Sequence, residues 1–243
     1  MLLLAATLGA IMSTNLYAPE APKRNVLVFS KTRGFRHDSI PNGRRAIYKI
    51  ADERNWTVTF TEDSTWFDEK KLKAFDALVF LCTTGDVLED EQQRALENYI
   101  HAGGGYVGIH AAADTEYEWP WYGKLVGGYF KIHPRIQEAV VKIEDSKHPA
   151  TKHLPNPWKR TDEWYDYKEN PRKGVHVLAS MDQKSYEGST MGDDHPIMWC
   201  QEFEGGRSFY TGFGHTKESY SDPLFTKLIG EAIEWVSEAK KKH

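Results

Sequence analysis

Three histidines lie in the segments that follow apolar runs, where a strand is expected to give way to a loop. His37 lies in RGFRHDS, His110 opens HAAADT, and His215 lies near the end of TGFGHT. Imidazole titrates near neutral pH and is also a common metal ligand. Glu163, in TDEWYDY, adds a carboxylate of the kind that zinc accepts beside imidazole. We predict that these four residues form one pocket, either as acid–base catalysts or as ligands of a divalent metal such as zinc.

A second group of residues is predicted to contact a small-molecule ligand. The chain has eight Trp and twelve Tyr, an aromatic content that suits a sugar or another ring-bearing ligand. The predicted binding set is Arg36, Asp114, Trp119, Trp121, His133, Trp164 and Tyr165. Asp114 lies one helical turn after His110, so the two side chains are expected to share a face. The alternative is that most of these aromatic rings fill the core, where Trp and Tyr are usually found.

Several polar residues also fit purely structural roles. His133 and His195 each precede a proline, a pairing common in turns between elements. Asp38 is predicted to cap the helix that follows it, because an aspartate in that position accepts a backbone N–H. Cys82 and Cys200 lie in apolar stretches and are predicted to be buried, without an implied disulfide.

The elements that must position these residues alternate in the first half of the chain. Strands are predicted at residues 25–30, 56–60, 77–82 and 105–109, and helices at residues 41–55, 69–75 and 89–102. Alternating strands and helices are typical of a parallel sheet with helices on both faces. Ligands bind beyond the carboxyl ends of such strands, which places His37 and His110 at one edge.

The second half is predicted to add a hairpin and a closing helix. Apolar runs at residues 197–203 and 207–212 flank Glu204-Gly205-Gly206, a pattern that favours a β-hairpin. Further strands are predicted at residues 136–143 and 175–180, the last helix at residues 222–239, and loops at residues 116–134 and 148–170. The loop after the hairpin would carry His215 to the same edge of the sheet.

Length and charge restrict the organisation of the chain. The 243 residues carry a net charge of −4, and the only basic block is residues 240–242, so a nucleic-acid interface is not expected. Residues 25–243 are predicted to form one domain. The apolar run at residues 2–12 is too short to span a bilayer and resembles part of a secretory signal, so residues 1–24 are excluded from the fold. This predicts a periplasmic or secreted protein, whereas translation from Met12 would leave it in the cytoplasm.

Taken together and in order, these motifs resemble the ThuA-like (trehalose utilisation) family. The motifs are RGFRHDSI, GGGYVGIHAAADT, LVGGYFKIHP, TDEWYDY and HPIMWCQEFEGGRSFYTGFGHT, and with the final helix they cover about residues 25–237. The resemblance implies a class I glutamine-amidotransferase-like fold. This is an α/β, flavodoxin-like, doubly wound and mostly parallel sheet with helices on both faces and an added β-hairpin.

The resemblance also indicates that amidotransferase chemistry is absent. In glutamine amidotransferases a nucleophilic cysteine occupies a strand-to-helix elbow, and His110 stands at or beside that place in this sequence. The late His-x-Glu pair of those enzymes is not matched by His215-Thr216-Lys217. Glutaminase activity is not expected, because thiolate attack needs a thiol.

The family association implies a role in the catabolism of trehalose and related disaccharides or glycosides that partner dehydrogenases oxidise to 3-keto forms. The ketone makes the neighbouring C–H acidic, so an isomerase, lyase or hydrolase could act by proton transfer or with a metal. On this hypothesis His110 and His37 are base and acid, Glu163 orients one of them, and His215 completes the pocket. The expected partners are a small sugar substrate, a functionally linked sugar 3-dehydrogenase and further copies of the chain. The alternatives are a non-catalytic sugar-binding or scaffold domain and a metal-dependent hydrolase of another small molecule.

Overall fold

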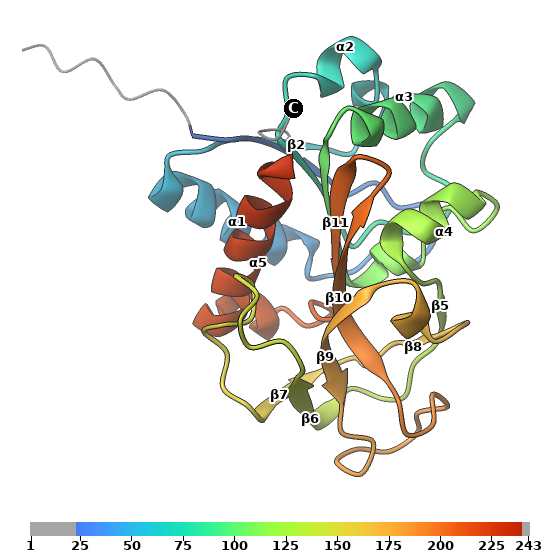
Figure 1. Cartoon of the computed structure of the whole chain (residues 1–243), viewed down its shortest axis with the longest axis vertical. Helices are drawn as coiled ribbons and strands as arrows, with labels where there is room; N and C mark the ends of the chain where they lie inside the picture. The colour runs from blue at the N-terminus through green and yellow to red at the C-terminus, as the bar shows by residue number, and fades with distance from the viewer. Residues whose placement is uncertain (1–22, 240–243) are drawn as a thin grey trace, which may run out of the picture.

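A nine-stranded sheet runs through the part of the chain that the structure, a computed structural model, describes, residues 23–239 (Figure 1). Its strands are β1 (Asn25–Phe29), β2 (Thr57–Thr61), β3 (Ala77–Leu81), β4 (Gly105–Ile109), β6 (Gln137–Ile143), β7 (Trp158–Asp162), β9 (His176–Met181), β10 (Pro196–Phe203) and β11 (Gly206–Thr211). They lie in the order β2-β1-β3-β4-β11-β10-β9-β6-β7. Two further strands, β5 (Phe130–Ile132) and β8 (Asp166–Tyr167), pair separately.

Helices cover both faces of the sheet. The α-helices are α1 (Ile40–Arg54), α2 (Glu69–Leu72), α3 (Asp90–His101), α4 (Pro120–Val126) and α5 (Pro223–Ser237). Short 3-10 helices are η1 (Ser64–Trp66), η2 (His110–Ala113), η3 (Pro171–Lys173) and η4 (Glu218–Ser221). Figure 1 shows α1 and α5 together on one side of the sheet and α3 and α4 on the other. None of the helices in the described range combines the length and apolar character needed to cross a bilayer.

The parallel half of the sheet follows the order predicted from the sequence. Strands β2, β1, β3 and β4 pair in parallel, and every residue of β3 and β4 is buried. Continuous apolar runs produce such strands because helices cover both of their faces. The predicted α/β, flavodoxin-like fold is confirmed, and the carboxyl ends of these strands share one edge.

The predicted hairpin is also present, and it joins the sheet beside β4. β10 and β11 pair antiparallel, while β11 pairs in parallel with β4. This register sets Thr211 opposite Ile109. The segments that follow these two residues therefore leave the sheet at the same edge, although they are far apart in the sequence.

Four elements lie in segments predicted as loops, namely α4, β5, β7 and β8. β7 was not predictable from an apolar run because its sequence is WKRTD, in which buried and exposed residues alternate. Arg160 points inward there, bonds to Asp162 and Ser219, and lies over the Phe213 and Phe225 rings. A buried arginine with these partners is recognisable only in the folded structure.

The predicted leader falls largely outside the described residues, which begin at Lys23. The prediction that nothing before residue 25 belongs to the fold is wrong for the last two residues. Lys23 donates its backbone N–H to Asn55, and the buried Arg24 lies 2.7 Å from Glu234 in an ion pair. The fold therefore includes residues 23 and 24.

Candidate functional site

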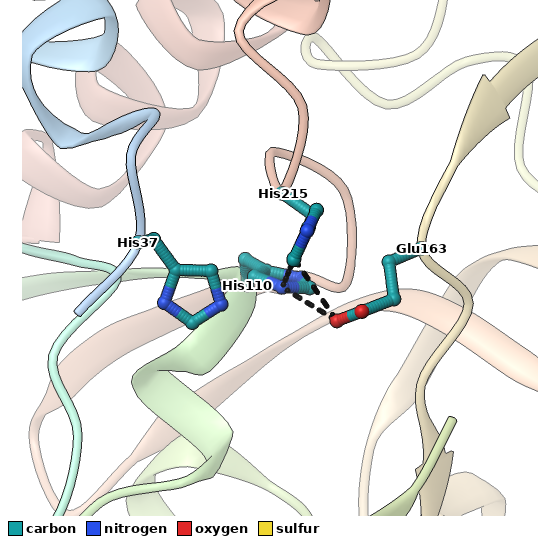
Figure 2. Close-up of side chains that lie close together, drawn as sticks. All are labelled: His37, His110, Glu163 and His215. Atoms are coloured by element: carbon teal, nitrogen blue, oxygen red, sulfur yellow. Dashed lines mark hydrogen bonds and ion pairs between the residues drawn. The ribbon is translucent and has the colours of Figure 1, made fainter. Parts of the chain in front are cut away.

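The four residues predicted to form a pocket meet at the carboxyl edge of the sheet (Figure 2). His37 follows β1, His110 follows β4, His215 follows β11, and Glu163 follows β7. One nitrogen or carboxylate oxygen from each lies within 4.8 Å of those of the others. His37, His110 and Glu163 are buried, and His215 is partly exposed. The structure thus brings together residues from four separate segments.

His110 is held in an unusual backbone conformation. It is the first residue of η2 and has a φ of 51°, in the left-handed region that disfavours a residue with a Cβ. Its ring is fixed by Nδ1, which lies 2.9 Å from the Gly212 carbonyl oxygen. A carbonyl only accepts, so Nδ1 carries the hydrogen and donates it. The other ring nitrogen, Nε2, lies toward the cluster.

Two ring nitrogens and one carboxylate oxygen form a small triangle at the centre of the cluster. His110 Nε2 lies 3.2 Å from His215 Nδ1 and 3.3 Å from Glu163 Oε2, and those last two atoms are 3.0 Å apart. Ligands bound about 2.0 Å from one tetrahedral metal ion would be about 3.3 Å apart, close to these edges. One hydrogen on His215 cannot form hydrogen bonds along all three edges of the triangle. A single cation, in contrast, can contact all three atoms. The backbone carbonyl on the other nitrogen of His110 is the outer partner that metal-bound histidines usually have.

His37 lies beside this triangle as a neutral imidazole. Burial, together with the nearby His110 and His215 rings, lowers the pKa of His37 to about 2. Figure 2 shows one ring nitrogen on the side that faces His110. Its buried Nδ1 has no hydrogen-bond partner within the described residues. His37 is therefore an uncharged ring with a nitrogen close enough to the other three residues to join them in holding a metal or a ligand.

Glu163 and His215 form a polarised pair. Burial alone would raise the pKa of the Glu163 carboxyl, but contacts with His110 and His215 hold it well below its usual range. Burial would lower the pKa of His215, but its contact with Glu163 and the charge of that carboxylate raise it. The cluster therefore keeps one carboxylate ionised against its imidazoles.

Asp162 organises the loop that presents His215, and sequence reasoning missed this role. Its buried carboxylate accepts hydrogen bonds from the backbone N–H groups of Gly214 (2.9 Å) and Thr216 (3.1 Å). Gly214 has a φ of 113°, and a Cβ there would lie 2.7 Å from the Tyr220 hydroxyl oxygen. The adjacency of Asp162 to Glu163 in TDEWYDY was the available signal. Such a carboxylate fixes the loop as a capping residue fixes a helix.

Two residues of the predicted binding set border the cluster. His133 Nδ1 lies 3.1 Å from Glu163 Oε1, and the side chain is 42% exposed, so it lies at the opening of the site. The Tyr165 ring lies with its centroid 4.1 Å from that of His110 and 4.1 Å from that of Phe130. The predicted sugar stacking by Tyr165 is corrected, because this buried ring packs between two protein rings and supports His110 instead.

The three predicted tryptophans lie outside the cluster. Trp164 is fully buried and donates its indole N–H to the Gln137 carbonyl, so it is a core residue. Trp119 and Trp121 stack on each other. They donate their indole N–H groups to Glu97 and Glu204 respectively. The buried Trp164 ring has no face open to a sugar, which corrects the prediction for that residue. Trp119 and Trp121 are partly exposed, and their contact with a sugar stays a prediction.

The remaining polar predictions have mixed outcomes. Arg36 is exposed and pairs with Glu62 at 2.7 Å. Asp114 is partly buried at the end of η2 and accepts a hydrogen bond from Tyr117. Asp38 is not the cap of α1: Ser39 occupies that position and donates its hydroxyl to the Gly214 carbonyl. The prediction placed the cap one residue too early. The residue before the helix is Ser39, and its hydroxyl bonds to the loop that bears His215.

The two cysteines are buried free thiols, as predicted. Burial raises the pKa of both Cys82 and Cys200 to about 12, which keeps them in the thiol form. Cys82 follows β3 with a φ of 50°, but α3 begins only at Asp90, so no helix follows it directly. Neither thiol stands in place of His110 at the end of β4.

Comparison with known proteins identifies the family. A family model described as ThuA, trehalose utilisation, matches residues 25–236. A comparison with curated proteins gave no match. A ThuA-like protein from Bacteroides uniformis is similar in structure, with a TM-score of 0.78 and 27% identity over 90% of this chain and 93% of that chain. A ThuA-like protein from Parabacteroides merdae gives a TM-score of 0.73 at 19% identity, over 90% of this chain and 91% of that chain.

A more distant likeness extends the fold beyond these two proteins. Part of a β-galactosidase from Bacillus circulans has a TM-score of 0.58 at 11% identity, over 86% of this chain and 30% of that chain. At this level of identity the similarity concerns the fold alone. The family match, by contrast, spans nearly all of the described residues, and the chain belongs to the ThuA family, described as trehalose utilisation.

Proposed function

We propose that this protein is a metal-dependent enzyme of carbohydrate catabolism that acts on a 3-keto derivative of a disaccharide or glycoside related to trehalose. The observation that carries the proposal is the triangle of His110 Nε2, His215 Nδ1 and Glu163 Oε2, with edges of 3.0–3.3 Å. Three converging acceptors with one open side are the arrangement that catalytic zinc and related ions use.

The chemistry follows from what each residue offers. A divalent ion in this site would polarise the ketone oxygen of the substrate and acidify the neighbouring C–H. His37, uncharged and beside the open side of the triangle, would hold the polarised oxygen or a hydroxyl next to it. The half-exposed His133 would contact the substrate at the opening. The result would be isomerisation, or elimination-type cleavage of the glycosidic bond.

The proposal that the substrate is a carbohydrate is supported by the family match and not by the geometry of the site. The ThuA description, trehalose utilisation, favours a carbohydrate substrate. The buried, high-pKa thiols of Cys82 and Cys200 argue against an amidotransferase-type cysteine nucleophile. A 3-keto sugar fits because its ketone gives a metal site an oxygen to polarise and a C–H to acidify.

The test is metal analysis and turnover on protein purified without chelator. We expect about one divalent ion per chain, as one set of converging ligands binds one metal, and conversion of 3-keto-trehalose or a methyl 3-keto-glucoside. Glu163→Gln should lose both metal and turnover. Glu53→Gln, the same change at a 62% exposed position on α1, should retain them. Full activity without metal would overturn the metal role, and sugar affinity without product would identify a binding domain instead.

A further inference from the structure

One role in the proposed reaction has no residue so far, namely the group that accepts the proton from the substrate carbon. His110 uses Nδ1 on Gly212 and Nε2 toward the cluster, while His215 turns Nδ1 toward Glu163. These side chains are therefore engaged once a metal binds. His37 lies against the His110 and His215 rings and is already assigned to the substrate oxygen in the proposed function. Removal of a proton from carbon therefore calls for a group outside the four.

Asp114 lies close enough to His110 for the charge of that ring to act on its carboxyl, and it is not one of the four members of the cluster. It terminates η2, four residues after His110, and its backbone is fixed because its carbonyl accepts the Gly85 N–H at 2.8 Å. The Tyr117 hydroxyl donates to its Oδ1 at 2.6 Å. No hydrogen bond to Oδ2 is present within the described part of the chain. One carboxylate oxygen is thus anchored and the other is available.

A series of contacts between aromatic residues connects the Asp114 carboxylate to His110. The Tyr117 hydroxyl that anchors Asp114 also lies 3.1 Å from the Phe130 carbonyl oxygen. The Phe130 ring packs on Tyr165, and the Tyr165 ring packs on His110, each with centroids 4.1 Å apart. A series of contacts through Tyr117, Phe130 and Tyr165 therefore links Asp114 to His110.

The surroundings of Asp114 strengthen it as a base. Burial raises the pKa of its carboxyl, against the Tyr117 hydrogen bond and the charges of His110 and Lys168, which lower it. The Lys168 ammonium lies 3.9 Å from the centre of the Tyr117 ring and does not pair directly with the carboxylate. A carboxylate that is partly desolvated and lacks a salt-bridge partner accepts a proton more readily than an exposed one.

We infer that Asp114 is the catalytic base, and that its Oδ2 removes the proton from the carbon next to the ketone. This inference rests on the proposed function. The C–H bond breaks, its electron pair forms a carbon–carbon double bond, and the ketone electrons move onto the oxygen held at the metal site. For isomerisation, the proton is returned to the former ketone carbon, the hydroxyl on the deprotonated carbon loses its proton to become the new ketone, and the former ketone oxygen takes up that proton as a hydroxyl. For elimination, the ketone re-forms, a double bond forms between the deprotonated carbon and the carbon that bears the glycosidic oxygen, and the departing oxygen takes up the proton from Asp114. Neither route needs an oxidant or a reductant.

Exchange of substrate hydrogen with solvent tests this step directly. The metal-loaded full chain is mixed with a methyl 3-keto-glucoside in deuterium oxide, and loss of the hydrogens beside the ketone is followed by proton NMR. Asp114→Asn is informative because its amide oxygen can still accept the Tyr117 hydroxyl, so a purely structural role would be preserved. Asp52→Asn, the same change on the exposed side of α1, is the matched control.

Each outcome supports or overturns the inference. We expect Asp114→Asn to keep its metal and melting temperature but to lose exchange and turnover by about 10²–10⁴-fold, the usual contribution of a general base. Tyr117→Phe should retain both activities at a reduced rate. Exchange by Asp114→Asn within about threefold of the parent, against that 10²–10⁴-fold expectation, overturns the inference but leaves the metal site standing. A metal-loaded parent that neither exchanges nor converts the probe overturns the proposed function as well.

Discussion

His110 Nε2 and His215 Nδ1 lie 3.2 Å apart, although the two residues are separated by 105 positions in the chain. They meet because β4 and β11 are parallel neighbours in the sheet and end at the same edge. The pairing of the two strands therefore determines whether the site exists. Several measurements follow from this arrangement.

Metal binding should stabilise the folded protein and not only activate it. An ion that binds the folded state alone adds about 2.7 kcal/mol to the free energy of unfolding at one hundred times its Kd. We expect the melting temperature to rise when zinc is added to chelator-treated protein. His215→Ala should abolish this rise, while His176→Ala, at a 59% exposed position, should leave it intact. An equal response from both variants would show that zinc binds elsewhere.

The left-handed backbone of His110 predicts an unusual order of stabilities. At a φ of 51°, any residue with a Cβ is strained by about 1 kcal/mol or more relative to glycine. His110→Gly should therefore unfold at a higher urea concentration than His110→Ala, although both lose the imidazole. The comparison is made in excess chelator so that metal binding does not contribute. Equal midpoints, or a more stable alanine variant, would mean that the strain is relieved elsewhere.

Glu116 predicts a pH-dependent loss of stability on the alkaline side. Burial is the largest cause that raises the pKa of this carboxyl to about 7, and the nearby Asp86 adds to the shift against hydrogen bonds from Val87 and Leu88. Because the folded pKa exceeds the ordinary value of 4.5, the folded state holds the proton more tightly, and its advantage is lost as pH rises from 4.5 through 7.

Replacing that carboxyl by an amide isolates the effect. The free energy of unfolding of Glu116→Gln, minus that of the parent, should increase by about 2 kcal/mol between pH 5 and pH 8. Denaturant unfolding at the two pH values measures this difference. Glu53→Gln, the same change at an exposed position on α1, is the matched control. A flat profile for Glu116→Gln would show that the carboxyl ionises freely in the fold.

The indole of Trp121 should contribute to packing and not to sugar binding. Trp121 packs against Trp119 and Phe203 and donates its N–H to Glu204. Trp121→Ala is expected to lower the melting temperature and to leave kcat/KM for a 3-keto-glucoside within about twofold, since it removes packing and no substrate contact. A large rise in KM at unchanged stability would return this side chain to the binding site.

Much of the sheet was predictable because local sequence determines it. The strands β1, β3 and β4 are short apolar runs between helical patterns, and such runs fit only a sheet covered on both faces. β7 was not predictable because Arg160 is buried only through partners that lie far away in sequence, such as Ser219. From the sequence alone, a polar residue such as Arg160 is predicted to be exposed, because the partners that allow its burial are not yet known.

For the candidate site, too, one part was predictable from the sequence and another was not. His37, His110 and His215 were predictable because strand ends in a parallel arrangement share an edge. Their mutual distances, the direction of His110 Nε2 and the position of Tyr165 were not, because they depend on the turn after β4 and on the carbonyl of Gly212. The prediction for Trp164 failed because an aromatic residue near a motif in sequence says little about where its ring points.

The four ligand-bearing segments also set an order of events during synthesis. His37 and His110 belong to the half of the sheet that is made first, whereas Glu163 and His215 follow strands made later. A growing chain can complete the β2-β1-β3-β4 core long before β11 is available to pair with β4. Under the proposed function, the ion could therefore be taken up only after β11 has paired with β4. Its uptake would be one of the last steps in maturation, and a metal-loaded molecule would be one whose sheet is complete.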